Sequence, residues 1–447
     1  MVHSKSRHGE RLVEIPHFPS EILGNTRSLF VYLPPDYHEN SERRYAVLYM
    51  HDGQHVFSAD AAGESWDMHV TADRLVAEGR MDGILIVGIA TVPDQRLNEY
   101  FHEHPNMHRA FKPPFAGERY EAFVIDEVMP YINRTFRTLT GPEHTAMMGS
   151  SAGGIVTYNI GFRRPDVFGH IAVMSPYFVK ADFDKEGELR EIPFYRRYGT
   201  HPKLRVWLDM GGAEGTFMEK YAREEAERLV ADGFVPGEDL MLYLHPGAGH
   251  SQSDWAARAH APLLYFFGRI GEPEALEICG DDIVGVKGLL KRINPVVTYT
   301  SGFVQTAMRG TYTVLDPQLL EVKPDGTLIA KSPGTTRVIV QYGNCTADKE
   351  ITIVDALPER VNVTVTVKVP ASTPPYPSLY AGIEVKPAGD GLYKGSAMIP
   401  HGLTFTFKVS HGFGRHERLK PDSGITRRSF VASSDQELYY EVEDWEI

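Results

Sequence analysis

Apolar and polar positions along the first 268 residues follow a pattern that predicts an α/β sheet. Short runs that are apolar throughout are typical of strands buried on both faces of a parallel sheet. Such runs occur at 45–50, 145–148, 204–210 and 240–244. Longer segments with helical character lie between or after them, at 155–161, 217–231 and 254–268. We therefore predict a doubly wound, mostly parallel sheet covered by helices.

The pattern changes after Pro273, where the alternation of strands and helices stops. Short stretches of alternating polar and apolar residues follow, separated by turns such as Asp325-Gly326. This is typical of β-sandwich modules. A chain of 447 residues is also too long for one average domain. We predict an α/β unit at 1–273, which we expect to bury its own core, and two all-β sandwich modules at 274–356 and 357–447.

The stretch GSSAGG, at Gly149–Gly154, lies between a predicted strand and a predicted helix. It fits the pattern G-x-S-x-G in one register only, Gly149 to Gly153, with Ser151 at the centre and Ser150 as the variable residue. In such an elbow the central serine occupies a strained turn and its hydroxyl projects from the sheet edge. Ser151 is therefore the candidate nucleophile.

A serine nucleophile needs a histidine to take its proton and a carboxylate to orient that histidine. Downstream of Ser151, Glu214 and His250 each follow a predicted strand, in the order Ser, Glu, His. The ends of such strands are where open α/β sheets place their sites. Asp209 is the alternative acid, but it falls inside a predicted strand and fits a structural role. We favour Glu214 as the acid and His250 as the base.

The oxyanion of the tetrahedral intermediate needs backbone N–H donors. One is expected from the residue after the nucleophile, Ala152, and a second from an early strand-to-helix loop. The loop HDGQ follows the predicted strand at 45–50, and we place the second donor at Gln54.

Three histidines in FHEHPNMH invite a metal-site interpretation, which we do not favour. His104 and His108 have the spacing of one helical turn, but Pro105 breaks a helix between them. No acidic ligand follows at a familiar interval. We expect no metal, and we expect this stretch, with His102, to shape the mouth of the site.

Residues from about 30 to 268 resemble the esterase D group of α/β-hydrolases, which includes feruloyl, acetyl-xylan and enterobactin-type esterases. The segments that carry the resemblance are YLPPDY (32–37), HDGQ (51–54), RLNEY (96–100), MGSSAGG, RRPDVFG, MSPYF, GGAEG and GAGH. The resemblance implies an α/β-hydrolase fold, the triad and oxyanion residues above, and no cofactor. It also implies a substrate pocket near Asp52, Arg96, Glu99, Tyr100 and Tyr177.

The two β-rich modules carry resemblances of their own. Residues 275–354 resemble bacterial Ig-like modules of group 2, and 358–447 resemble starch-binding modules. Sugar binding of that type uses exposed aromatic rings, and the last module has Trp445 with Tyr376, Tyr380 and Tyr393 as candidates. A spacer, or a lid packed over the catalytic unit, is the alternative. Whether Cys279 and Cys345 form a disulfide stays open.

Net charge and hydropathy exclude some function classes. A formal net charge of −13 gives no support for nucleic-acid binding. No apolar run approaches the ~20 residues of a membrane helix. The first residues lack the apolar segment of a signal peptide. Localisation stays open: cytoplasmic if Met1 is the native start, secreted if a signal peptide was removed. Oligomeric state stays open too.

Three functions fit these features. The first is a serine carboxylesterase acting on small phenolic or glycan-linked esters. The second is a siderophore trilactone esterase, whose catecholate substrate would favour cationic pocket residues such as Arg96. The third is a non-catalytic surface binding protein, although an intact Ser–Glu–His order argues against it. Acyl transfer instead of hydrolysis stays open, because both proceed through the same acyl-enzyme.

Overall fold

The computed structural model describes residues 11–60, 63–412, 415–419 and 426–446. Its first part is an eight-stranded sheet with the order β1-β2-β4-β3-β5-β6-β9-β10. The pairs β1–β2 and β2–β4 are antiparallel, and all other neighbours are parallel. The strands are β1 (Leu12–Ser20), β2 (Asn25–Tyr32), β3 (Ala46–Met50), β4 (Ile84–Ile89), β5 (Thr145–Ser151), β6 (His170–Pro176), β9 (Arg205–Gly211) and β10 (Leu240–His245).

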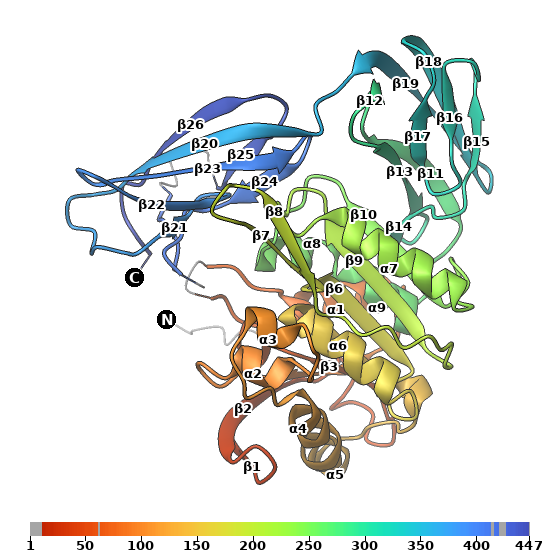
Figure 1. The fold of residues 1–447 in the computed structure, drawn as a ribbon. Helices are drawn as coiled ribbons and strands as arrows, with labels where there is room; N and C mark the ends of the chain where they lie inside the picture. The colour runs from red at the N-terminus through yellow and green to blue at the C-terminus, as the bar shows by residue number, and fades with distance from the viewer. Residues whose placement is uncertain (1–10, 61–62, 413–414, 420–425, 447) are drawn as a thin grey trace, which may run out of the picture.

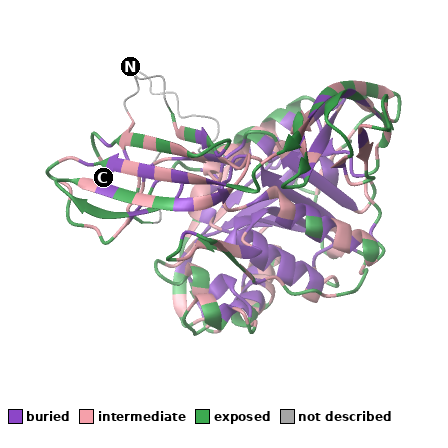
Figure 2. Cartoon of the chain, turned by 45° about the horizontal axis from the view of Figure 1, so that its top comes forward, coloured by how far each residue is buried: buried purple, intermediate pink, exposed green. Residues whose placement is uncertain are grey.

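Helices cover both faces of this sheet, as a doubly wound fold requires (Figure 1). One apolar cluster contains residues of α6 and α7, and a second, on the other face, contains residues of α1, α8 and α9. Buried residues accordingly fill the sheet and the helix faces against it (Figure 2). The helices are α1 (Met68–Ala77), α2 (Arg96–Tyr100), α3 (Met107–Ala110), α4 (Gly117–Ala122), α5 (Met129–Thr135), α6 (Ala152–Arg163), α7 (Glu219–Ala231), α8 (Gln252–Arg258) and α9 (His260–Phe267), with the short turns η1 (Gly53–His55), η2 (Phe123–Val128) and η3 (Pro142–His144).

The predicted α/β-hydrolase class is confirmed by this architecture. The apolar runs at 45–50, 145–148, 204–210 and 240–244 form β3, β5, β9 and β10. The last predicted helix, at 254–268, is two helices, α8 and α9, and not one. A small hairpin, β7 (Val179–Phe183) and β8 (Leu189–Pro193), rises from the end of β6.

The middle part of the chain forms two sheets around an apolar cluster. One sheet has the order β11-β13-β17-β16 with β14 on β13, and the other has the order β12-β19-β18-β15. Val284, Ile293 and Val338 come from three of these strands and meet in the cluster. The strands are β11 (Pro273–Gly280), β12 (Ile283–Lys287), β13 (Lys291–Tyr299), β14 (Val304–Thr306), β15 (Thr311–Val314), β16 (Leu320–Val322), β17 (Thr327–Ala330), β18 (Gly334–Tyr342) and β19 (Cys345–Ala356).

The last part, which we call the third module (residues 357–447), is also built of strands. Its main sheet has the order β21-β22-β23-β20-β26, and the hairpin β24–β25 packs against it through Phe405 and Phe430. The strands are β20 (Arg360–Lys368), β21 (Leu379–Tyr380), β22 (Glu384–Gly389), β23 (Leu392–Pro400), β24 (Thr404–Phe407), β25 (Arg428–Val431) and β26 (Gln436–Glu441). β19 ends at Ala356 and β20 begins at Arg360, so these bounds are compatible with the division that we propose there.

The first unit does not bury its core alone, which corrects our expectation. The cluster on the α9 side of the sheet includes Val297 and Phe303 of the middle part together with Trp207 of β9. The rings of Trp207 and Phe303 lie 5.9 Å apart. Sequence patterning missed this shared core because periodicity reports which face of a strand is apolar and not which module covers it.

The middle part also covers the edge of the catalytic sheet. At the last strand, β10, the Leu244 N–H donates to Thr306 Oγ1 at 2.9 Å, and Asn294 Nδ2 donates to the Leu244 carbonyl at 2.8 Å. An uncovered edge strand presents unpaired backbone groups that promote aggregation. At Leu244, these side chains satisfy both backbone groups.

Candidate active site

Ser151 occupies a strained turn between β5 and α6. It is the last residue of the strand, and its backbone has φ 57° and ψ −121°. A positive φ is unfavourable for a residue with a side chain and persists only where the surroundings enforce it. A Cβ added at Gly149 would lie 2.6 Å from the Gly153 carbonyl oxygen, so strand and helix approach too closely for any larger residue. The elbow predicted from GSSAGG therefore has the expected backbone.

Glu214 and His250 are brought together from two loops at the same end of the sheet. Glu214 follows β9 and His250 follows β10. The Nδ1 atom of His250 lies 2.6 Å from Oε2 of Glu214. The Glu214 side chain is fully buried, whereas about a fifth of the His250 side chain is exposed. A carboxylate held on Nδ1 fixes the ring orientation and stabilises the imidazolium form.

The other oxygen of Glu214 is held by residues that sequence reasoning did not single out. Oε1 accepts hydrogen bonds from the Gly211 N–H at 2.6 Å and from Ser175 Oγ at 2.5 Å. The Arg258 guanidinium lies 3.3 Å from the same oxygen. Trp255 Nε1 donates to Ser175 Oγ at 2.9 Å. Ser175 stands in the segment MSPYF, so the family resemblance was the one signal that pointed near it.

Asp209, the alternative acid, lies inside β9 and has no exposed surface. Its carboxylate accepts from Trp207 Nε1 at 2.7 Å and from the Ser175 N–H at 3.1 Å, and it pairs with Arg258 at 3.0 Å. Burial raises the pKa of Asp209, against the opposing effect of Arg258. These contacts give Asp209 a structural role beneath Glu214.

Ser151, the last residue of β5, and His250, which follows β10, lie at the same end of the sheet. Within the ranges that the structure describes, no hydrogen bond joins the Ser151 hydroxyl to the His250 ring, and catalytic hydrogen bonds of this kind often form only with substrate bound. The ring of His250 stacks on Phe217 with centroids 4.1 Å apart and meets Trp255 edge-on at 4.9 Å. These two contacts restrict the orientation of the imidazole.

The predicted oxyanion donors lie where β3 and β5 end. Ala152 is the first residue of α6, where backbone N–H groups have no partner within the helix. Gln54 lies in η1 after β3, and its side chain is tied to Thr91 by bonds of 2.9 and 3.1 Å. The side chain of Gln54 is thereby fixed in place, and the donor that the prediction assigns to Gln54 is its backbone N–H.

Asp52 and Arg96 form an ion pair beside this loop. Arg96 Nε and Nη2 donate to the two Asp52 oxygens at 2.6 and 2.8 Å. Burial disfavours the charge on Arg96, yet Asp52 raises its pKa above the ordinary value. Tyr100 is buried behind the pair, and its hydroxyl accepts from the Asp52 N–H at 3.1 Å. Asp52 itself has φ 54°, a second strained position.

Glu99 points elsewhere. Its carboxylate is bound by Arg27 through two bonds of 2.8 Å, and Asn25 donates to it at 3.1 Å. Arg27 and Glu99 are both almost fully buried. This pair joins α2 to β2, so we assign Glu99 to the scaffold and not to the pocket.

Tyr177 belongs to a group of aromatic rings that reaches the candidate base. Its ring centroid lies 5.3 Å from that of Phe217, which in turn stacks on His250. On its other sides lie Phe101, Phe111 and Phe194, at 6.3, 6.2 and 5.5 Å. Burial raises the pKa of Tyr177 to about 12. We call Phe101, Phe111, Tyr177, Phe194 and Phe217 the aromatic group.

The histidines of FHEHPNMH are engaged separately. His102 Nε2 lies 3.2 Å from Glu121, His104 accepts from the Asn106 N–H at 3.2 Å, and His108 pairs with Glu103. Among the described residues, no three or more His, Cys, Asp or Glu side chains are grouped as metal ligands would be. Cys279 and Cys345 are both free thiols.

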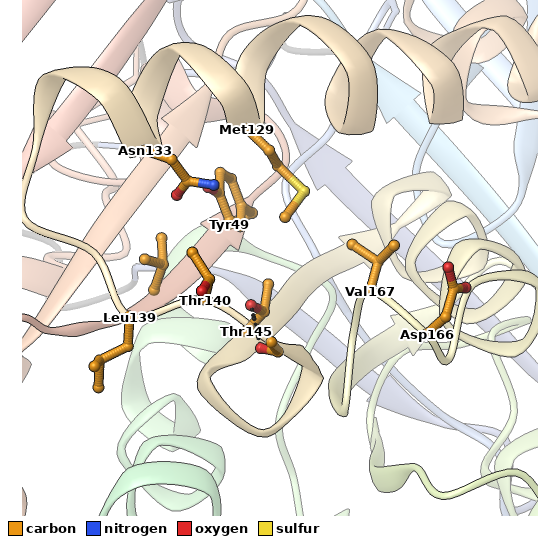
Figure 3. Close-up of a pocket in the computed structure, with 10 residues that line it drawn as sticks. Tyr49, Met129, Asn133, Leu139, Thr140, Thr145, Asp166 and Val167 are labelled. Carbon is orange, nitrogen blue, oxygen red and sulfur yellow. Dashed lines mark hydrogen bonds between the residues drawn. The ribbon is translucent and has the colours of Figure 1, made fainter.

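A cavity of about 160 Å³ lies at the opposite end of the strands, lined by residues that include Tyr49, Met129, Asn133 and Thr145 (Figure 3). Thr145 begins β5 and Ser151 ends it, so at ~3.3 Å per residue the cavity lies roughly 20 Å from the elbow. We do not assign the substrate to it.

In the described part of the chain, no helix is both long and apolar enough to cross a membrane.

The sheet, the elbow and the Glu–His pair at its carboxyl edge define an α/β-hydrolase. The chain belongs to the Esterase family, whose profile matches residues 20–265. It is an esterase-type hydrolase, a carboxylesterase.

Comparisons with individual proteins agree with this class. Over 166 residues the chain is 30% identical to an endo-1,4-β-xylanase/feruloyl esterase of Xylanibacter ruminicola, covering 35% of this chain but only 20% of that relative. The uncharacterized protein YbbA of Bacillus subtilis is 22% identical over 262 residues, covering 56% of this chain and 96% of YbbA.

Solved structures similar to this chain include a ferulic acid esterase of Anaeromyces mucronatus, with TM-score 0.41 and 20% identity, covering 57% of this chain and 89% of the other. The enterobactin esterase of Shigella flexneri has TM-score 0.42 and 17% identity, and the match covers 57% of this chain and 59% of that esterase.

Proposed function

We propose that the protein cleaves carboxylic esters with Ser151 as nucleophile, His250 as general base and Glu214 as the acid that orients it. The observation that carries the proposal is the 2.6 Å contact between His250 Nδ1 and Glu214, at the same end of the sheet as a serine held in a strained elbow. This is the arrangement that activates a serine hydroxyl.

The reaction proceeds in two halves. Ser151 Oγ attacks the ester carbonyl while His250 Nε2 takes its proton, and the N–H groups of Ala152 and Gln54 bind the oxyanion. The intermediate collapses, the C–O bond to the alcohol breaks, and His250 returns the proton to the leaving alkoxide. A water molecule, deprotonated by His250, then attacks the acyl carbon. The bond from that carbon to Ser151 Oγ breaks, His250 returns the proton to Ser151, and the acid is released.

We propose a phenolic acid as the acyl part of the substrate. Phe217 stacks on His250 and Tyr177 contacts Phe217, and both rings are partly exposed, so they are available to a planar acid. The name of the Xylanibacter ruminicola relative includes feruloyl esterase activity, which agrees with this choice. Arg96 supports a catecholate siderophore less well, because Asp52 already neutralises its charge.

A substrate panel tests the proposal. Purified protein is assayed with 4-nitrophenyl acetate, methyl ferulate, acetylated xylan and a trilactone siderophore, and substrates are ranked by kcat/KM. We expect methyl ferulate to rank first. A higher kcat/KM for the trilactone would replace the phenolic ester with a siderophore. No turnover of any ester, with no labelling of Ser151 by a fluorophosphonate, would indicate a binding protein.

A further inference from the structure

The third module contacts both loops that carry the candidate triad. In Figure 1 its strands lie over the β7–β8 hairpin and the end of the catalytic sheet where β9 and β10 finish. The hairpin contact is direct, since the Met398 N–H donates to the Gly187 carbonyl at 2.8 Å. The module's contacts at the Glu214 and His250 loops lie closer to the candidate triad.

Strand β24 extends across the loop that holds Glu214. Phe405 pairs with Glu214 in an antiparallel bridge. On either side of the bridge, the Gly215 N–H donates to the Thr404 carbonyl at 3.1 Å, and the Thr406 N–H donates to the Ala213 carbonyl at 2.9 Å. The acid is thus the central residue of a short two-stranded ladder whose second strand belongs to another module. Such a ladder restrains the backbone on both sides of the carboxylate.

Arg427 contacts the loop that holds His250, as β24 contacts the loop that holds Glu214. Its guanidinium forms ion pairs with Asp254 and, at 3.3 Å, with Glu64, and it donates to Ser253. Asp254 accepts from Ser251 Oγ at 2.7 Å, and Ser251 directly follows His250. One side chain of the third module therefore connects the start of α8 to the loop after β3. About a sixth of the Arg427 side chain is exposed, so the ion pairs are partly shielded from water.

Two glycines, Gly215 beside Glu214 and Gly249 beside His250, lie where residues of the third module pack against these loops. A Cβ at Gly215 would lie 2.6 Å from the Phe405 ring. A Cβ at Gly249 would lie 3.4 Å from both Thr406 Cβ and Arg427 Nη1, and 3.1 Å from Asp254. The motifs GGAEG and GAGH thus place a glycine next to Glu214 and next to His250, where residues of the third module pack against both loops.

We propose that the third module is a positioning element of the active site, in which β24 fixes the Glu214 loop and Arg427 fixes the His250 loop. This inference rests on the proposed function of Glu214 and His250. The contacts of β24 and Arg427 are to the chain neighbours of Glu214 and to the start of α8, so their effect acts on the placement of the base. A displacement of the order of 1 Å in such a group lowers the rate by up to about 10²-fold.

The test compares full-length variants at two contacts between the same modules. Arg427→Met removes the charge next to the triad and keeps most of the side-chain volume. Arg427→Lys restores the charge but not the fork that reaches several acceptors at once. The control is Arg360→Met, because Arg360 pairs with Glu188 at the β7–β8 hairpin and not at a triad loop.

For Arg427→Met we expect kcat on 4-nitrophenyl acetate to fall about tenfold with KM changed less than about twofold. Arg427→Lys should recover part of the loss, and Arg360→Met should retain wild-type kcat. Thermal unfolding of all three verifies that they fold. Unchanged kcat in folded Arg427→Met, or an equal loss in Arg360→Met, would overturn the inference. A wild-type protein without esterase activity would instead refute the proposed function.

Discussion

Glu214 and His250 meet through one carboxylate oxygen, Oε2, at 2.6 Å, while Oε1 is held by Gly211, Ser175 and Arg258. The two carboxylate oxygens of Glu214 therefore have separate functions. One orients the imidazole, and the other fixes the carboxylate to the ends of β6 and β9. Because the second set of contacts is buried, the acid cannot rotate away from His250 without leaving polar groups unpaired.

Glu214→Gln is expected to lower kcat by at least roughly 10²-fold, because an amide does not stabilise the imidazolium and can select the wrong tautomer. Asp209→Asn is the matched comparison in the same strand and loop region. It weakens the buried pair with Arg258 and should lower the free energy of unfolding by about 3 kcal/mol, with a smaller effect on kcat. Steady-state kinetics and urea unfolding separate the two. Near-normal turnover of Glu214→Gln would give the orienting function to another acid.

Ser151→Ala is expected to abolish ester turnover, whereas Ser150→Ala should retain most of it. The two serines are adjacent, but Ser151 alone has the strained backbone that turns its hydroxyl out of the sheet. Mass spectrometry after reaction with a fluorophosphonate identifies the modified residue. Modification of Ser150 alone would contradict the register that we assign.

The sequence predicted the parts of this site that depend on local pattern. Ser151 became a candidate because an elbow needs glycines at fixed spacing, and His250 became a candidate because it follows the last apolar run. The supports were missed because they depend on contacts between distant segments. Ser175 and Arg258 reach Glu214 from β6 and α8, and no local pattern distinguishes them from other polar residues of strand ends and helices.

Contacts between distant segments also account for the position of Glu99 and for the core that the first unit shares with the middle part. By position in RLNEY, Arg96 and Glu99 are equally good candidates for pocket residues. The structure pairs Arg96 with Asp52 but Glu99 with Arg27, a residue far back in the chain. Likewise, the alternating pattern after Pro273 predicted strands, but it did not show that Phe303 would pack on Trp207 across the module boundary.

Tyr177→Leu is expected to raise KM for methyl ferulate and to leave KM for 4-nitrophenyl acetate nearly unchanged. An aromatic contact contributes about 0.5–1.5 kcal/mol beyond apolar burial, which corresponds to roughly two- to tenfold in binding. Tyr177→Phe keeps the ring and serves as the control, with wild-type KM for both esters. Equal KM for methyl ferulate in wild type and Tyr177→Leu would show that the acyl part binds elsewhere.

Acid should destabilise the fold through buried histidines. Burial lowers the pKa of His51 to about 3 and that of His170 to about 4, from an ordinary value of 6.5. The unfolded chain therefore binds more protons than the folded one as the pH falls below 6.5. Each group lowers the free energy of unfolding by about 1.4 kcal/mol per pH unit, down to its folded pKa.

His170 allows a clean measurement because it lies at the start of β6, far from the elbow end of the sheet. Its Nε2 atom lies 3.1 Å from the Glu143 carbonyl, and its ring stacks on Phe266. Urea unfolding of wild type and His170→Gln at pH 6, 5.5 and 5 should show a shallower pH dependence in the variant. Identical slopes would mean that His170 is not neutral in the folded protein.

A fragment that ends at Gly271 is expected to aggregate, in contrast to what the sequence pattern alone suggests. The cut removes Val297 and Phe303 from the core around Trp207, and it removes the side chains that satisfy Leu244 on the edge strand. Both changes expose surface that promotes association. A fragment ending at Ala356 keeps these contacts and loses the third module, including β24 and Arg427. It should therefore stay soluble but hydrolyse 4-nitrophenyl acetate with a reduced kcat. Size-exclusion chromatography and steady-state kinetics on the two fragments test this, and a monomeric 1–271 fragment with full-length kinetics would show that the first unit needs neither of the others.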